Sequence, residues 1–198
     1  FKALGWGAAI GIDSDPVAAE RARALGRDVR HGGAERLPVA DGTVDAVFMH
    51  HLLEHVQRPA DIIEQARRVL KPGGRIVITT PNAESVGVHR HKEMWRGFEA
   101  PRHLQIFTLA ALGNLLAAGG FVVTTARTSA RARPFMDAAS LSVASAHGDG
   151  ASRPRGFWGQ LRKILADDGK VLSTERQIRR GENVGEELFV VAEKAIGS

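Results

Sequence analysis

The sequence predicts an α/β protein, with a doubly wound and mostly parallel sheet, in a single domain over residues 1–198. A chain of 198 residues is the usual size of one domain. Its 43% hydrophobic and 25% charged residues are typical of a globular protein. Strand and helix signals alternate along the first two-thirds, as in parallel βαβ units. The chain has no cysteine, which excludes disulfides, thiolate metal sites and a cysteine nucleophile.

Local signals place the elements in order. A short buried strand is expected over 8–12, and a second over 28–31. Between them Asp15 can cap a helix that begins at Pro16 and ends near Leu25. The remaining expected elements are a strand over 44–49, a helix over 59–70 ended by Lys71-Pro72-Gly73-Gly74, a strand over 75–80, a polar histidine-rich loop to about 107, a helix over 108–118, and strands over 121–125 and 187–192.

Two regions bear on the domain organisation. Residues 104–126 lack charge and are long enough to span a bilayer, but the Gly119-Gly120 pair favours a helix followed by a strand. We therefore expect no membrane partner. Residues 134–183 show no clear period, and we expect a helical insertion that forms a lid or a homodimer surface.

Charge and composition narrow the classes of partner. All of the net charge of +5 falls beyond residue 86, and such a bias can attract an anionic small molecule. Solvated surface arginines are the simpler explanation. Few aromatic residues and no tyrosine argue against a nucleic-acid stacking surface. No secretory leader is visible, so we expect a cytoplasmic location. The positively charged residues that gather in one region beyond residue 86 are Arg90, Lys92, Arg96, Arg102, Arg127, Arg131 and Arg133.

Several runs of residues resemble the class I S-adenosylmethionine-dependent methyltransferases. They keep the order and spacing of that family over about residues 8–82, and the segment 101–121 resembles its small-molecule and sugar methyltransferases. The runs are Gly11–Pro16 (GIDSDP), Gly33–Pro38 (GAERLP), Asp41–Asp45 (DGTVD), Leu52–Val56 (LLEHV), Arg68–Gly74 (RVLKPGG) and Pro81-Asn82.

The resemblance implies S-adenosylmethionine as the cofactor and gives roles to single residues. Asp13, with Ser14 beside it, follows a strand, where a carboxylate can bind ribose hydroxyls; alone, it could equally be a helix cap. Ala34 and Glu35 are expected along the adenine. His50 and His51 are expected at the methionine portion, facing the substrate.

Two departures from the family are visible. Gly33 stands where an adenine-binding aspartate is common. The glycine-rich loop and the strand before it are missing, and residues 1–5 resemble the end of the following helix. That strand would lie centrally, between the strands at 8–12 and 44–49. Because its loss leaves unpaired edges, we expect the chain to be part of a longer protein.

The histidines admit alternative roles. His51, Glu54 and His55 match the H-x-x-E-H pattern of a zinc protease, or could bind a divalent metal. We favour capping and packing for Glu54 and His55, and therefore expect no metal. His103 is the predicted general base, because the histidine pKa suits proton removal near neutral pH; ordering its loop is an equal alternative.

The predicted function is methyl transfer to an oxygen, or secondarily a nitrogen, of a small molecule. An anionic or sugar-containing acceptor would suit the arginines. The alternatives are a noncatalytic binding or scaffold module derived from this fold, and an NAD(P)-dependent oxidoreductase.

Overall fold

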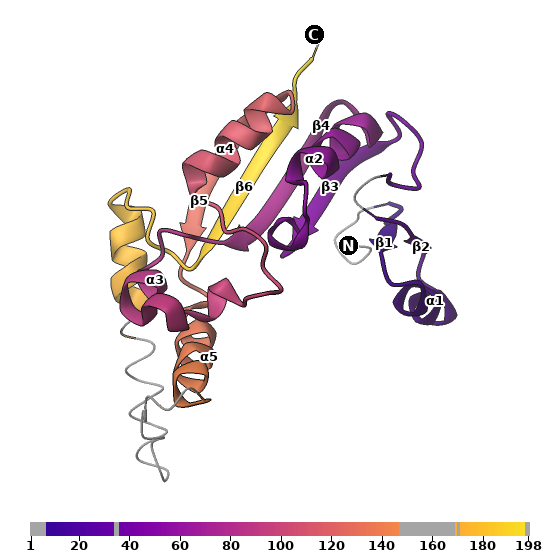
Figure 1. Ribbon diagram of the computed structural model, residues 1–198. Helices are drawn as coiled ribbons and strands as arrows, with labels where there is room; N and C mark the ends of the chain where they lie inside the picture. Colours follow the sequence, from indigo (N-terminus) through magenta and orange to yellow (C-terminus); the bar gives the residue numbers. More distant parts are fainter. Residues whose placement is uncertain (1–6, 34–35, 147–168, 170, 197–198) are drawn as a thin grey trace.

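The computed structural model describes residues 7–33, 36–146, 169 and 171–196. Within them the strands form two groups: a parallel pair, and a four-stranded sheet with the order β3-β4-β6-β5. Figure 1 shows the pair beside the β3 edge of the larger sheet. No ladder joins the two groups among these residues.

The pair consists of β1 (Gly11–Asp13) and β2 (Val29–His31), joined through α1 (Pro16–Ala24). Asp15 caps α1 as predicted, its carboxylate accepting the Val17 N–H at 2.8 Å. The prediction of a buried strand over 8–12 was wrong in length and burial, since β1 has three residues and Ile12 is exposed. The physical reason is that β1 has only one paired neighbour among the described strands.

In the larger sheet, β3 (Val44–His50), β4 (Leu70–Pro81) and β5 (Phe121–Ser129) run in one direction, and β6 (Glu187–Lys194) is antiparallel to its neighbours β4 and β5. Two strands are longer than predicted. The strand β4 begins at Leu70, which pairs with Val44. The strand β5 continues to Ser129, which pairs with Glu187. In both cases the neighbouring strand extends the ladder past the local stop signal.

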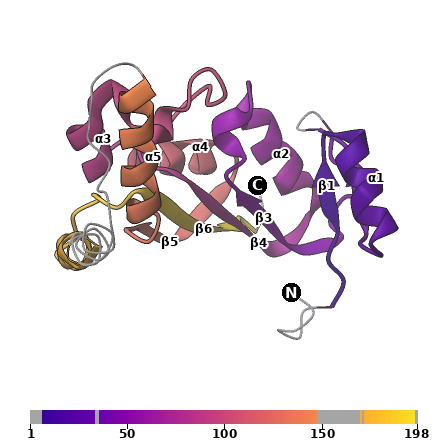
Figure 2. The same cartoon turned by 90° about the horizontal axis from the view of Figure 1, so that it is seen from below.

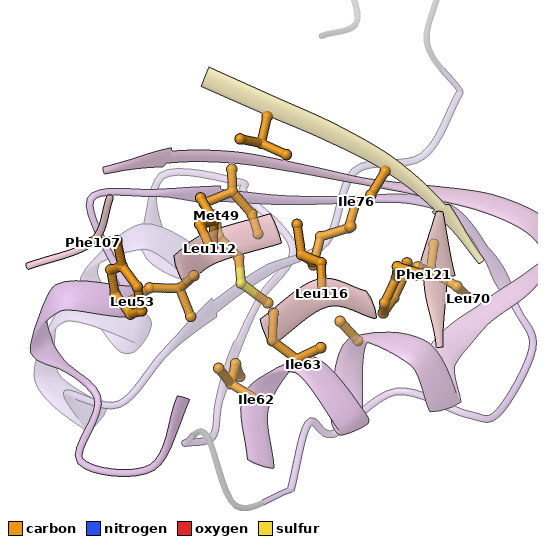
Figure 3. Packing of buried hydrophobic residues seen from close by; sticks show 14 of the residues in the cluster. Met49, Leu53, Ile62, Ile63, Leu70, Ile76, Phe107, Leu112, Leu116 and Phe121 are labelled. Atoms are coloured by element: carbon orange, nitrogen blue, oxygen red, sulfur yellow. The ribbon is translucent and has the colours of Figure 1, made fainter. Parts of the chain in front are cut away.

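Helices α2 (Pro59–Val69) and α4 (Leu109–Ala118) cover one face of this sheet (Figure 2). The apolar side chains of α2 recur at helical spacing, so Ile63 and Ala66 are fully buried. In α4, the Thr108 hydroxyl accepts the Ala111 N–H at 3.0 Å and caps the first turn, and Leu112 and Leu116 are buried. Figure 3 shows Met49, Ile63, Ile76, Leu112, Leu116 and Phe121 packed in this core.

The region after β4 is not the loop that was predicted. It contains α3 (Val86–His91) and two short 3-10 helices, η3 (Lys92–Met94) and η4 (Arg96–Phe98). The helix α5 (Arg133–Ala146) follows β5, at the start of the region where helical structure was expected. Trp95 is 1% exposed and donates from its indole nitrogen to the buried Glu186 carboxylate at 3.1 Å. This long-range contact orders a stretch whose sequence has no apolar period.

The uncharged stretch over 104–126 splits into α4 and β5, as predicted. No helix in the described ranges is long and apolar enough to cross a membrane. A further helix spans 171–179. Much of the region 134–183 lies outside the described residues, so its role as a lid or dimer surface stays a prediction.

Candidate functional site

The candidate site lies where β3 and β4 end and β6 begins. The register brings these points to one edge, because His50 pairs with Thr79, and Pro81 with Glu187. After His50 the chain turns at His51, whose φ of 48° lies in the left-handed region. It then enters the 3-10 helix η2 (Leu53–His55). Ligands of open α/β sheets bind beyond this end of the strands.

The His51 ring lies between two carboxylates and contacts both. Its Nδ1 lies 2.9 Å from Glu54 Oε1, and its Nε2 lies 2.9 Å from Glu187 Oε1. The hydrogen bond to Glu187, followed by that to Glu54, raises the pKa of His51 to about 9, although burial opposes the charge. His51 is therefore an imidazolium at neutral pH, with both nitrogens donating.

This geometry excludes the zinc-protease arrangement, because His51 has no free nitrogen for a metal and lies outside η2. That chemistry needs two ligating histidines. The expected role of His51 at the methionine portion of the cofactor stays a prediction.

Glu54 is fully buried and held by two side chains. Its Oε1 faces His51, and its Oε2 accepts the Thr80 hydroxyl at 2.9 Å. Burial opposes ionisation, but the bonds from His51, its own backbone N–H and Thr80 outweigh it, so the pKa of Glu54 is lowered. The buried carboxylate is thus kept charged at the edge of the sheet.

The segment after η4 packs directly on η2 and brings His103 to the site. The Leu104 N–H donates to the Glu54 carbonyl at 2.7 Å, and the Gln105 side-chain amide donates to the Val56 carbonyl at 2.7 Å. The His55 and His103 rings meet edge to face, with centroids 4.7 Å apart. The His103 side chain is only 7% exposed, so it is packed into this edge of the sheet.

Two of the predicted cofactor residues, Asp13 and Ser14, lie at a second location, the end of β1, whereas His50 ends β3. Asp13 is partly exposed, and one of its carboxylate oxygens accepts the Asp15 N–H at 2.9 Å. Ser14 and His50 are exposed. Ala34 and Glu35 lie outside the described residues. Among the described residues no hydrogen bond joins the Asp13 end to the His51 end, so the structure does not yet unite the two sets.

Most of the arginines behind the positive charge are already paired. Arg90 and Arg133 contact Asp137, and Arg96 and Arg102 contact Glu99. Arg127 stacks on the Phe189 ring at 4.6 Å. Burial acts to raise the pKa of Glu99, but the Arg96 and Arg102 guanidinium groups outweigh it and hold the pKa low. The sequence excess therefore overstates the charge available to an anionic ligand.

Sequence reasoning missed Thr80, Glu99 and Glu187 as members of this region. Thr80 lies near the carboxyl end of β4, and the rule that singled out Asp13 could have included it. Glu187 begins β6 and falls outside that rule. What the sequence does not contain is the register that pairs Glu187 with the end of β4.

Comparison with known proteins agrees with this architecture. A family model described as a methyltransferase domain matches residues 1–126. A protein of Mycolicibacterium smegmatis, named a probable S-adenosylmethionine-dependent methyltransferase, is 35% identical over 116 residues, which are 58% of this chain and 43% of that protein. The malonyl-[acyl-carrier protein] O-methyltransferase of Hahella chejuensis is 29% identical over 138 residues, 66% of this chain and 48% of that protein.

The fold is also found among solved structures. An S-adenosylmethionine-dependent methyltransferase from Thermotoga maritima superposes with a TM-score of 0.60 at 19% identity, covering 93% of this chain and 72% of that chain. The two curated matches span less than half the length of those relatives. With the family match over residues 1–126, the chain belongs to the class I S-adenosylmethionine-dependent methyltransferases.

Proposed function

We propose that the protein transfers a methyl group from S-adenosylmethionine to an oxygen of a small molecule. The observation that carries this proposal is the group formed by His51, Glu54, His55 and His103, which packs beyond the end of β3 in a chain of this family. An oxygen acceptor is supported by the name of the Hahella relative, an O-methyltransferase.

The donor chemistry of the residues fits part of the cofactor. The Asp13 carboxylate keeps one oxygen without a hydrogen-bond partner among the described residues, and a carboxylate at this place can accept from vicinal ribose hydroxyls. We assign Ser14 to the same binding face, and Ala34 and Glu35 to the adenine. His50 and His51 are assigned to the methionine portion, facing the substrate. When bound, S-adenosylmethionine supplies a methyl group activated on a positively charged sulfur.

The residues of this chain would act mainly by positioning. Holding an acceptor oxygen in line with the methyl carbon can contribute most of the rate enhancement. His103 would take up, at Nε2, the proton that the acceptor hydroxyl loses. That nitrogen can accept it, because Nδ1 already donates to the Gly97 carbonyl at 2.6 Å.

The class of acceptor is a separate part of the proposal. An anionic or sugar-containing molecule remains the prediction from sequence. Its electrostatic support rests on Lys92 and Arg131, for which the structure gives no ion pair with a described residue. A neutral hydroxylated acceptor fits the histidine group equally well.

Binding of S-adenosylhomocysteine to the natural full-length protein tests the cofactor assignment. Asp13→Asn retains an acceptor oxygen for the Asp15 N–H but loses the charge. We expect titration calorimetry to show at least tenfold weaker binding. The matched control is Asp28→Asn, which neutralises an exposed carboxylate directly before β2 and should bind within twofold of wild type. Equal binding by both variants, or binding of NADH instead, contradicts the proposal.

A further inference from the structure

One cluster near the histidine group offers ligand atoms that point to a bound cation. Within the described ranges, Glu54, His55 and His103 each provide a nitrogen or oxygen donor, and these atoms lie within 4.8 Å of one another. Two come from η2 and the third from the segment packed on it. We call these three residues the triad. Two imidazoles and one carboxylate are ligands that suit divalent first-row transition metals.

The two imidazoles are oriented with a free lone pair. Nδ1 of His55 lies 2.9 Å from the Arg102 carbonyl oxygen, and Nδ1 of His103 lies 2.6 Å from that of Gly97. A carbonyl oxygen can only accept, so both Nδ1 atoms carry the hydrogen. In the neutral rings each Nε2 therefore keeps a lone pair. Metal-binding histidines are oriented in the same way, by donating the other ring N–H to a carbonyl or carboxylate.

Glu54 has the supporting contacts of a metal ligand as well. Its side chain is fully buried, and the bonds from His51 and Thr80 fix its orientation. A carboxylate has about four lone pairs, so the bonds from His51, Thr80 and its own backbone N–H leave acceptor capacity on the oxygens. A buried anion beside two lone-pair nitrogens is a favourable setting for a cation.

The nearest competitor for His103 is Glu99. Its Oε2 lies 3.6 Å from His103 Nε2, which is too far for a hydrogen bond, and the same carboxyl group already accepts from Arg96 and Arg102. A bound ion would replace this loose contact. Metal–ligand bonds of 2.0–2.2 Å in a tetrahedral site separate the ligands by about 3.4 Å. The triad would therefore contract by up to about 1.4 Å, within reach of side-chain rotation.

We propose that the triad binds one divalent transition-metal ion, with Zn²⁺ as the probe. Three protein ligands leave a position open for a water or a hydroxyl oxygen. Resting on the proposed function, that position would take the acceptor hydroxyl and promote loss of its proton to solvent. The general-base role of His103 then belongs to the metal-free protein, since one lone pair cannot bind both a proton and an ion. This differs from the expectation that Glu54 and His55 only cap and pack.

Direct metal analysis of the natural full-length protein tests the site. The protein is stripped with EDTA, dialysed against Zn²⁺ and analysed by mass spectrometry, with titration against a chromophoric chelator for affinity. We expect one equivalent of zinc, and at least a hundredfold weaker binding in His55→Gln and in His103→Gln. His89→Gln is the matched control, because His89 is exposed and outside the triad. Replacement by Co²⁺ should give a visible d–d spectrum that both triad variants lose.

Two measurements keep the outcome interpretable. Circular dichroism confirms that each variant is folded, and S-adenosylhomocysteine binding is measured on the same samples. Wild type that holds no more zinc than His103→Gln overturns the metal site, as does zinc binding that survives both triad substitutions. If cofactor binding persists in that case, only the metal inference fails. If S-adenosylhomocysteine does not bind to wild type, the proposed function fails, whatever the result with zinc.

Discussion

His51 couples folding to pH through its two carboxylate partners. With its pKa raised to about 9, the folded protein keeps a proton that the unfolded chain releases near 6.5. The stabilising contribution is therefore complete below pH 6.5 and is lost as the pH rises through about 9. Glu54 acts in the opposite sense, because its lowered pKa gives a contribution that is lost as the solution becomes acidic.

Replacing His51 should flatten this pH dependence. In His51→Asn the free energy of unfolding should fall less between pH 6.5 and 9 than in wild type. Asparagine suits the test because it tolerates a positive φ. Urea unfolding at a series of pH values gives the comparison, with the exposed His89→Gln as control. A wild-type free energy of unfolding that does not change over this pH range would argue against the contacts of His51 with Glu54 and Glu187.

The effect of Glu187 on His51 can be observed directly. Glu187→Gln removes the partner whose hydrogen bond contributes most to the raised pKa, so the imidazole should titrate closer to its ordinary pKa of 6.5. The readout is the pH dependence of the His51 ring resonances by NMR. Glu193→Gln, at the far end of the same strand, is the matched control and should leave the midpoint near 9.

At the scale of elements, the contact between α2 and α4 leaves no room for a methyl group at Gly119. An added Cβ would lie 2.5 Å from Ile63 Cγ2, whereas the backbone at Gly119, with φ of −80°, permits alanine. Gly119→Ala should therefore destabilise the fold by about 1–3 kcal/mol through overpacking.

Gly113 provides the comparison within the same helix. An added Cβ there meets nothing within 4 Å, so Gly113→Ala should stabilise the protein by up to about 1 kcal/mol through helix propensity. Thermal or urea unfolding separates the two variants. Changes of equal size and sign would contradict close packing of α4 on Ile63.

Trp95 and Glu186 join the short helices after β4 to the beginning of β6. Burial is the main cause of the raised pKa of Glu186, opposed by bonds from Ser85 and Trp95. Trp95→Phe removes one donor from a buried carboxylate and should cost about 2–3 kcal/mol. If the contact works as described, the same change should cost distinctly less in a Glu186→Gln background, as measured by a double-mutant cycle in urea.

Across the whole molecule, the two groups of strands differ in how much apolar surface they bury. The hydrophobic cluster draws on α2, α4 and the four-stranded sheet, with Leu37 its first residue along the chain. In α1 only Ala19 is buried, and β1 has no buried residue.

Hydrogen exchange should follow this division in the chain described here. Amides of β4 and β6 should open only with global unfolding, whereas those of β1, β2 and α1 should exchange at lower free energies. Mass spectrometry of peptides from the two regions provides the measurement. Equal protection in both would mean that the strand pair is held by interactions that its burial does not indicate.

The sequence by itself determined much of the fold. The Asp15 cap and the helical period of α2 act within a few residues and were confirmed in place. The order of strands and helices, the resemblance to methyltransferases and the importance of strand ends follow from the same local patterns. His103 was also chosen from sequence, though its chemical role stays a prediction.

Only the tertiary structure decided which of these side chains meet. His51 and Glu187 are 136 positions apart, and the register of β6 against β4 brings them together. The short helices η3 and η4 depend in the same way on the contact of Trp95 with Glu186. Local propensity cannot encode such pairs, because their energy arises only once distant strands have bound one another. The triad is of this kind, since His103 joins Glu54 and His55 through the packing of one segment on another.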